Sequence, residues 1–234
     1  MRPSRPADLP AAARRVPGAL RGRLATALVA RAGARRSLDP AAGAVALTFD
    51  DGPDPVFTPA LLDELARLQV TATFFLVGRR AEAHPALVRR ILADGHTVGS
   101  HSSTHPDPWR LGLRQLAGDY RRGRSQVERA AGRPAPLFRP PKGYVNGTGA
   151  AAMLAARARP WLWTIDPHDW EPGATTESIV AGVSGLGGGD VVLLHDAIEG
   201  PLAPAALDRS ATVAAVPAIV ALARGRGLQL TALA

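Results

Sequence analysis

Residues 44–77 read AVALTFDDGPDPVFTPALLDELARLQVTATFFLV, and the fold can be argued outward from this stretch. Each end of it is a short run rich in β-branched and aromatic residues, which predicts strands at 44–49 and 71–77. Between these runs, leucines spaced three and four residues apart predict a helix over 58–68, with Thr58 as its N-cap and Pro59 at its first position. Strand, helix and strand in this order predict a parallel βαβ unit.

The same alternation continues along the rest of the chain. Further strands are predicted at 96–100, 137–139, 161–165, 191–194 and 228–233, and further helices at 85–95, 113–132, 148–157, 176–186 and 210–224. Pro217 is expected to kink or restart the last helix. Because seven strands alternate with six helices, we expect an α/β fold that forms a distorted, incomplete (β/α)7 barrel, with an open doubly wound sheet as the second choice.

The composition excludes several classes of protein. Hydrophobic residues make up 46% of the 234 residues and charged residues 21%, as in ordinary globular proteins, so global disorder is not expected. The absence of cysteine excludes disulfides, a thiolate nucleophile and any cysteine-ligated metal site. No run of about 18 apolar residues exists, so we expect no membrane-spanning helix.

The net charge of +8 belongs to the start of the chain, because residues 1–37 hold nine arginines and a single acid, Asp8. We therefore divide the chain into an Arg/Pro/Ala-rich extension, 1–37, disordered or partly helical, and a main domain, 38–234, with no net charge. Arg31 interrupts the apolar stretch 24–34, which matches a secretory signal poorly, so a cytoplasmic and an extracytoplasmic location both stay open. The extension is suited to contacts with anionic surfaces, whereas the main domain is expected to be monomeric and to bind no nucleic acid.

Polar residues suited to catalysis follow five of the seven predicted strands, always at the carboxyl end. They are Asp50 and Asp51, His101 and His105, Arg139, Asp166 and Asp169, and His195 and Asp196. Active sites of parallel barrels are built from the loops at this end of the strands. The pattern therefore predicts an enzyme.

Two of these clusters have the spacing of metal ligands. His101 and His105 lie four residues apart, which would place both imidazoles on one face of a helical turn, although two exposed loop histidines are the alternative. Adjacent residues at a strand end point to opposite sides, so one of Asp50 and Asp51 can ligate a metal while the other faces a substrate. A simple Asp-Gly turn is the alternative for this second cluster.

Five segments together carry a resemblance to a known family. They are TFDDGP at 48–53, HSSTH at 101–105, FRPPKGYVN at 138–146, DPHDW at 166–170 and VVLLHD at 191–196. In order and spacing they resemble the motifs of the polysaccharide deacetylase family, also called carbohydrate esterase family 4 or the NodB-homology domain. The resemblance implies a distorted (β/α) barrel and a metal-dependent hydrolase that removes acetyl groups from an N-acetylated glycan, such as peptidoglycan or a chitin oligosaccharide.

The resemblance also implies a role for single residues. Asp51, His101 and His105 would hold one divalent cation, with zinc as the first choice and cobalt, nickel, iron or manganese as alternatives. A cation held by three protein ligands leaves positions open for water and substrate, as catalytic sites require.

The remaining catalytic roles fall on two pairs of residues. Asp50 would be the general base, with Arg139 holding it ionised. His195 would be the general acid that protonates the leaving amine, and Asp169 would orient its ring and favour the imidazolium.

Four residues would contact the substrate. The backbone N–H near Lys142 would bind the oxyanion, Tyr144 would line the sugar groove, and Trp170 and Leu193 would enclose the acetyl methyl group. Lys142 stands where the family usually has an aromatic residue. Thr71 stands where many relatives carry a basic residue, which would weaken the support of Asp169.

Three other functions remain open from the sequence. An O-acetyl esterase acting on a plant polysaccharide would use the same site. A non-haem iron oxygenase also uses two histidines and one carboxylate, but it gives no clear role to Asp50 or His195. A binding module that keeps the metal without turnover is the third, and the sequence does not choose the acetylated polymer.

Overall fold

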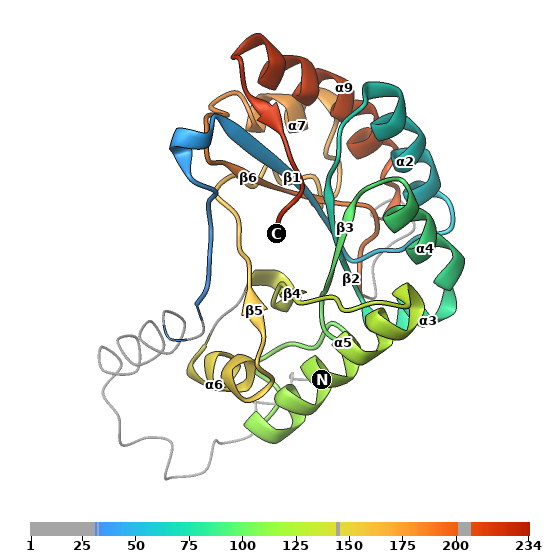
Figure 1. The fold of residues 1–234 in the computed structure, drawn as a ribbon, viewed down its shortest axis with the longest axis vertical. Coiled ribbons are helices and arrows are strands. Elements are labelled where there is room, and N and C mark those ends of the chain that lie inside the picture. Colours follow the sequence, from blue (N-terminus) through green and yellow to red (C-terminus); the bar gives the residue numbers. More distant parts are fainter. Residues whose placement is uncertain (1–30, 32, 144–145, 201–206) are drawn as a thin grey trace, which may run out of the picture.

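The computed structural model describes residues 31, 33–143, 146–200 and 207–234 (Figure 1). The expectations for most of the N-terminal extension and for Tyr144 therefore lie outside the described residues.

One curled sheet, in which all strands run parallel, forms the centre of the molecule (Figure 1). Its strands are β1 (Ala44–Asp50), β2 (Thr73–Leu76), β3 (Thr97–Ser100), β4 (Leu137–Phe138), β5 (Arg159–Pro160), β6 (Val191–His195) and β7 (Gln229–Leu230). They are ordered β5-β4-β3-β2-β1-β6, and β7 pairs with the first two residues of β1. The expected incomplete (β/α) barrel is confirmed.

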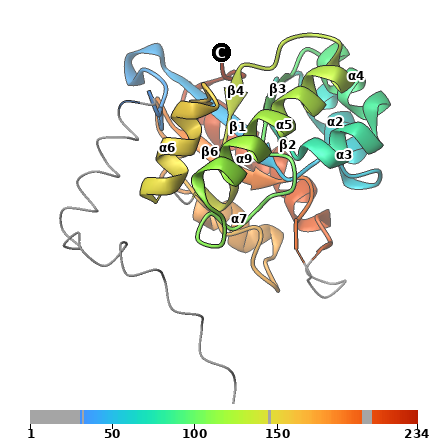
Figure 2. The same cartoon turned by 90° about the horizontal axis from the view of Figure 1, so that it is seen from below.

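Helices cover the outside of the sheet, as Figures 1 and 2 show. They are α2 (Phe57–Leu68), α3 (Gly78–Ala83), α4 (Pro85–Ala93), α5 (Leu113–Ala131), α6 (Gly147–Ala155), α7 (Thr176–Gly182) and α9 (Ser210–Gly225), with short 3-10 helices η2 (Pro40–Ala42) and η3 (Pro141–Gly143). None of the helices within the described ranges is both long enough and apolar enough to cross a membrane.

The central strand β1 has a different environment on each of its faces. Leu47 and Phe49 belong to the main hydrophobic core, together with buried residues of α2 and α9. Thr48 and Asp50 alternate with them and point inside the curl, where both accept hydrogen bonds from the same nitrogen of Arg139. This alternation explains why acids can stand at the end of a strand that is buried on both faces.

The strand predicted at 161–165 is displaced. The strand in this part of the chain is β5, and the residues after it form only isolated bridges to their neighbours. The cause is Arg139, whose guanidinium takes the backbone carbonyls of Trp161 and Leu162 as acceptors. These carbonyls therefore accept hydrogen bonds from a side chain instead of from the backbone N–H groups of a neighbouring strand.

Three details of the helices also differ from expectation. Val56, and not Thr58, is the N-cap of α2. Thr58 is already the second residue of this helix, and its hydroxyl donates to Oδ2 of Asp196 at 2.5 Å. The short helix α3 precedes the expected helix at 85–95. The last helix, α9, continues as a single element across Pro217.

Candidate metal centre and active site

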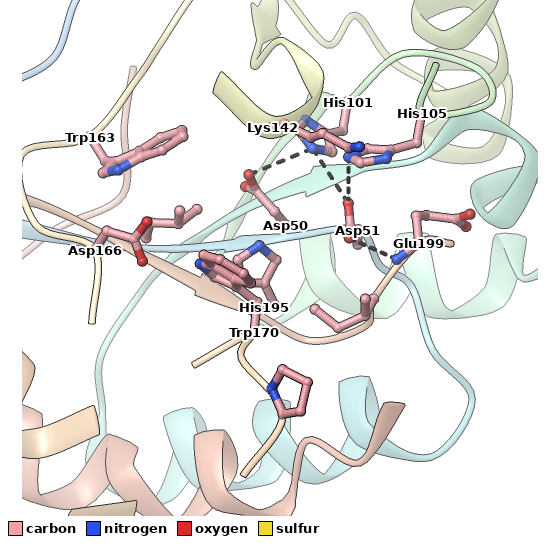
Figure 3. A pocket seen from close by; sticks show the side chains of 13 residues that line it. Asp50, Asp51, His101, His105, Lys142, Trp163, Asp166, Trp170, His195 and Glu199 are labelled. Carbon is pink, nitrogen blue, oxygen red and sulfur yellow. Dashed lines mark hydrogen bonds and ion pairs between the residues drawn. The ribbon is translucent and has the colours of Figure 1, made fainter. Parts of the chain in front are cut away.

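A cavity of about 550 Å³ lies at the carboxyl end of β1 and β6 (Figure 3). It is lined by the two acids at the end of β1, by both histidines of the HSSTH segment and by His195 at the end of β6. Asp50, Asp51 and His101 are each at least 96% buried, so these ionisable groups are largely removed from water. The polar residues that follow separate strands in the sequence therefore meet in one place.

Asp51, His101 and His105 form a set of three metal-ligand atoms that lie within 4.8 Å of one another. Nε2 of each histidine lies 3.4 Å from Oδ1 of Asp51. This Oδ1 is buried and has no hydrogen-bond partner, which is unfavourable for a carboxylate unless a cation lies beside it. Two imidazoles and one carboxylate around such an oxygen fit a single divalent cation.

His101 is held in the form that a metal requires. Its Nδ1 donates to the backbone carbonyl of Arg139 at 2.8 Å, so the lone pair of Nε2 faces Asp51 and His105. Burial, together with the neighbouring His105, lowers the pKa of His101 to about 3. The ring is therefore neutral at ordinary pH, and its second nitrogen is oriented by the backbone.

The segment between the two histidines is not the helical turn predicted from their spacing. It is a loop in which Ser102 and His105 have φ angles of 71° and 50°. Asp119 on α5 stabilises the loop by accepting hydrogen bonds from Ser103 N at 3.0 Å and from the Thr104 hydroxyl at 2.9 Å. These tertiary contacts replace the helical hydrogen bonds and still bring the two imidazoles together.

Arg139 is completely buried behind the cavity, and each part of its guanidinium has a partner. Its Nη1 donates to Oδ1 of Asp50 at 2.9 Å and to the Thr48 hydroxyl at 2.7 Å. Its Nε and Nη2 donate to the carbonyls of Trp161 and Leu162. The buried ion pair is therefore well satisfied, which is the condition for keeping two charges in the interior.

Asp50 uses its two oxygens differently. Oδ1 is held by Arg139, while Oδ2 lies on the side of the histidines, 3.7 Å from Nε2 of His101. Burial raises the pKa of Asp50, and the charges of Arg139 and His195 oppose this effect. Oδ2 is thus the oxygen of Asp50 that can exchange a proton on the cavity side.

His195 and Asp169 form the second buried pair. Oδ1 of Asp169 lies 2.7 Å from Nδ1 of His195, and Oδ2 accepts the His195 backbone N–H at 2.8 Å. Burial favours the neutral ring, but the charge and hydrogen bond of Asp169, aided by Asp51 and Asp50, outweigh it and raise the pKa of His195 to about 9. His195 is therefore protonated at neutral pH, with Nε2 as its remaining donor.

The support of Asp169 comes from the start of α9. The Thr212 hydroxyl donates to Oδ2 of Asp169 at 2.9 Å, and Nη1 of Arg209 donates to its backbone carbonyl at 2.5 Å. The sequence predicted weak support here because Thr71 replaces a basic residue, but the last helix supplies these two donors.

The expected substrate contacts line the same cavity. Lys142 reaches it from η3 with a left-handed φ of 59°, and Trp170 and Leu193 also line it. Trp170 is 40% exposed, so its ring is accessible from solvent. Tyr144 lies outside the described residues.

Sequence reasoning missed several residues of this site, among them Trp163, Glu199, Arg209 and Thr212. Trp163 lines the cavity, and an aromatic residue three positions before Asp166 was a usable signal for it. Glu199, Arg209 and Thr212 contact the site across segments far apart in the chain, so no local sequence pattern predicts their role.

Comparison with known proteins identifies relatives over most of the chain. The family model described as polysaccharide deacetylase matches residues 38–160. A peptidoglycan-N-acetylglucosamine deacetylase of Bacillus cereus is 39% identical over 180 residues, which cover 75% of this chain and 79% of the relative. A chitooligosaccharide deacetylase of Sinorhizobium fredii is 38% identical over 200 residues, which cover 82% of this chain and 91% of the relative.

The architecture agrees with the sequence comparison. The solved structure of a family 4 carbohydrate esterase from Streptomyces lividans in complex with acetate superposes with a TM-score of 0.71 at 36% identity, covering 80% of this chain and 91% of that chain. The family model spans the first three of the five motifs, and two relatives above 30% identity and a shared fold extend the likeness over most of the chain. This chain belongs to the polysaccharide deacetylase family.

Proposed function

We propose that this protein is a metal-dependent N-deacetylase that hydrolyses the acetamide group of N-acetylglucosamine units in a glycan such as peptidoglycan or a chitin oligosaccharide. The names of its relatives support the substrate class, and the site supports the reaction. Zinc is the proposed cation, because two imidazoles and one carboxylate suit it. We also propose a monomer, because a single chain supplies every side chain assigned to the reaction.

Asp51, His101 and His105 would hold the cation. When bound there, it would polarise the acetyl carbonyl and make a water molecule acidic enough to attack it. Asp50 then accepts the proton of that water at Oδ2, because Oδ1 is already occupied by Arg139.

His195 completes the reaction as the acid. Its Nε2 donates a proton to the nitrogen of the departing amine, which is a poor leaving group without that proton. Asp169 keeps the proton available by stabilising the imidazolium. The backbone N–H near Lys142 stabilises the oxyanion, while Trp170 and Leu193 enclose the methyl group.

One observation carries this proposal: an acid and a base line the same cavity as the ligand set, each with its own buried counter-charge. Arg139 is the counter-charge of Asp50, and Asp169 is the counter-charge of His195. Hydrolysis of an amide needs both proton transfers. An iron oxygenase has no role for either pair, and a pure binding module needs neither.

Acetate release from a panel of substrates tests the proposal. The panel contains chitin oligomers, peptidoglycan and O-acetylated xylan, and each is assayed with metal-free protein and after addition of zinc or cobalt under strict anaerobiosis. We expect metal-dependent release from at least one N-acetylated glycan. Release from O-acetylated xylan alone would favour the esterase. Acetate release with zinc or cobalt in the absence of oxygen would exclude an oxygenase mechanism, and no release from any substrate would contradict the proposal.

A further inference from the structure

The two oxygens of Asp51 have separate partners. Oδ1 faces the imidazoles of His101 and His105. Oδ2 accepts a hydrogen bond of 2.9 Å from the backbone N–H of Glu199, in the loop that follows β6 (Figure 3). The orientation of the carboxylate therefore depends on where the chain places Glu199.

The position of Glu199 is fixed by its own side chain, which is 96% buried and held by two arginines. Its Oε2 accepts from Nη2 of Arg79, and its Oε1 accepts from Nε of Arg80. Arg80 also donates from Nη2 to the backbone carbonyl of Ile198 at 3.2 Å. Arg79 and Arg80 lie in the first turn of α3, directly after β2. Glu199, Arg79 and Arg80, here called the Glu199 cluster, thus connect the ends of β6 and β2 across the end of β1.

The backbone at Asp51 needs such outside support. Asp51 has a φ of 72°, in the left-handed region that residues other than glycine rarely adopt. Strained backbone of this kind persists where surrounding contacts determine it. On the other side of Asp51, the carbonyl of Gly52 accepts the Val77 N–H at 3.0 Å. The chain at Asp51 is therefore held from both β2 and β6.

The carboxylate of Glu199 is not placed to ligate the cation itself. Both of its oxygens are paired with guanidinium groups, and Figure 3 shows it directed away from the two histidines. Its backbone N–H is the group that reaches Asp51. Glu199 thus acts on the site through Asp51.

We propose that the Glu199 cluster is a positioning unit for the metal ligand Asp51 and that it sets the affinity of the site for its cation. The proposal rests on the proposed function in one respect, namely that Asp51 is a ligand. Removing the cluster leaves Oδ2 without a fixed donor and lets Asp51 turn away from the histidines. Loss of partners behind metal ligands in other proteins weakens metal binding by about 10- to 100-fold.

Zinc affinity of the full chain, measured by competition with a chelating dye, tests this role without relying on turnover. We expect Glu199→Gln to weaken zinc binding by about 10- to 100-fold while one zinc still binds at saturation. The double variant R79Q/R80Q should weaken it to a similar extent. Combining R80Q with Glu199→Gln should add little, because both changes break one unit.

The matched control is Glu64→Gln, which breaks the Arg67–Glu64 pair on the outside of α2 and should leave the zinc affinity unchanged. Unfolding of the metal-free variants is followed in parallel. If Glu199→Gln does not fold, the zinc affinity of R79Q/R80Q tests the proposal instead. Zinc affinities of the folded cluster variants within about twofold of the parent's would overturn the proposal.

Asp51→Asn separates this proposal from the proposed function. If Asp51→Asn loses zinc and the cluster variants do not, only the positioning role is wrong. If Asp51→Asn itself keeps the parental affinity, then Asp51 is not a ligand and the metal site assigned here fails as well.

Discussion

Replacement of Asp169 by Asn tests the acid role of His195 through a change in pH dependence. The Asp169 carboxylate lies 2.7 Å from Nδ1 of His195, and its charge is the strongest influence that opposes the effect of burial on that ring. Asn has nearly the same size but no charge, while His195 stays buried. Because burial favours the neutral imidazole, the pKa of His195 in the variant should fall from about 9 to the ordinary 6.5 or below.

The size of the effect follows from the protonated fraction of His195. At pH 8 an imidazole with a pKa of about 9 is about 90% protonated, whereas one with a pKa of 6.5 is about 3% protonated. The value of kcat/KM at pH 8 should therefore fall by about 30-fold. Asp50 and Asp51 contribute to the raised pKa of His195, and a bound cation offsets their share, which reduces the fall, whereas a pKa below 6.5 in the variant increases it.

The assay is kcat/KM for acetate release as a function of pH, with zinc content measured on the same samples. We expect the alkaline limb of the Asp169→Asn profile to move to lower pH at unchanged zinc content. Asp166→Asn is the matched control, because Asp166 also lines the cavity but its carboxylate accepts the backbone N–H of His168, and this variant should keep the alkaline limb of the parent. An alkaline limb in Asp169→Asn that coincides with the parent's would refute the acid role of His195.

Three further changes have defined outcomes. Asp50→Asn should retain zinc while acetate release falls by about 100-fold or more, as expected for loss of a general base; parental activity would contradict that role. Arg139→Met leaves Asp50 buried without its partner and should lower the free energy of unfolding, measured with urea, by about 3–5 kcal/mol, with part of the loss restored in the double variant with Asp50→Asn. An unchanged urea midpoint would show that the pair is not needed. Gly143→Ala should lower the melting temperature, because Gly143 has a φ of 61° and an added Cβ would lie 2.2 Å from the Trp163 ring, and a melting temperature equal to the parent's would mean that this contact is absent.

The catalytic constellation was predictable because each of its residues closes a strand or follows one. A parallel sheet brings the carboxyl ends of its strands together, so Asp50, His101 and His195 had to meet once the alternation was recognised. The partners of Asp50 and His195 were implied by the motifs, and the structure places Arg139 and Asp169 against them at 2.9 Å and 2.7 Å.

What the sequence did not reveal depends on single tertiary contacts. The strand expected at 161–165 is displaced because a buried guanidinium competes for backbone carbonyls, and no local propensity contains that competition. The spacing of His101 and His105 is that of a helical turn, yet hydrogen bonds to Asp119 hold the segment as a loop. Glu199 reaches the metal ligand through its backbone N–H, a contact to which residue type gives no signal.

The zinc content of the parent and of His101→Ala, after loading with zinc and dialysis, tests the metal site most directly. The ligand set of Asp51, His101 and His105 predicts about one zinc per chain in the parent and almost none in the variant, because two remaining ligands cannot retain the ion. Asp50→Asn, which leaves the ligand set intact, should keep the parental zinc content. A full complement of zinc in His101→Ala would contradict the site, and with it the chemistry assigned to this protein.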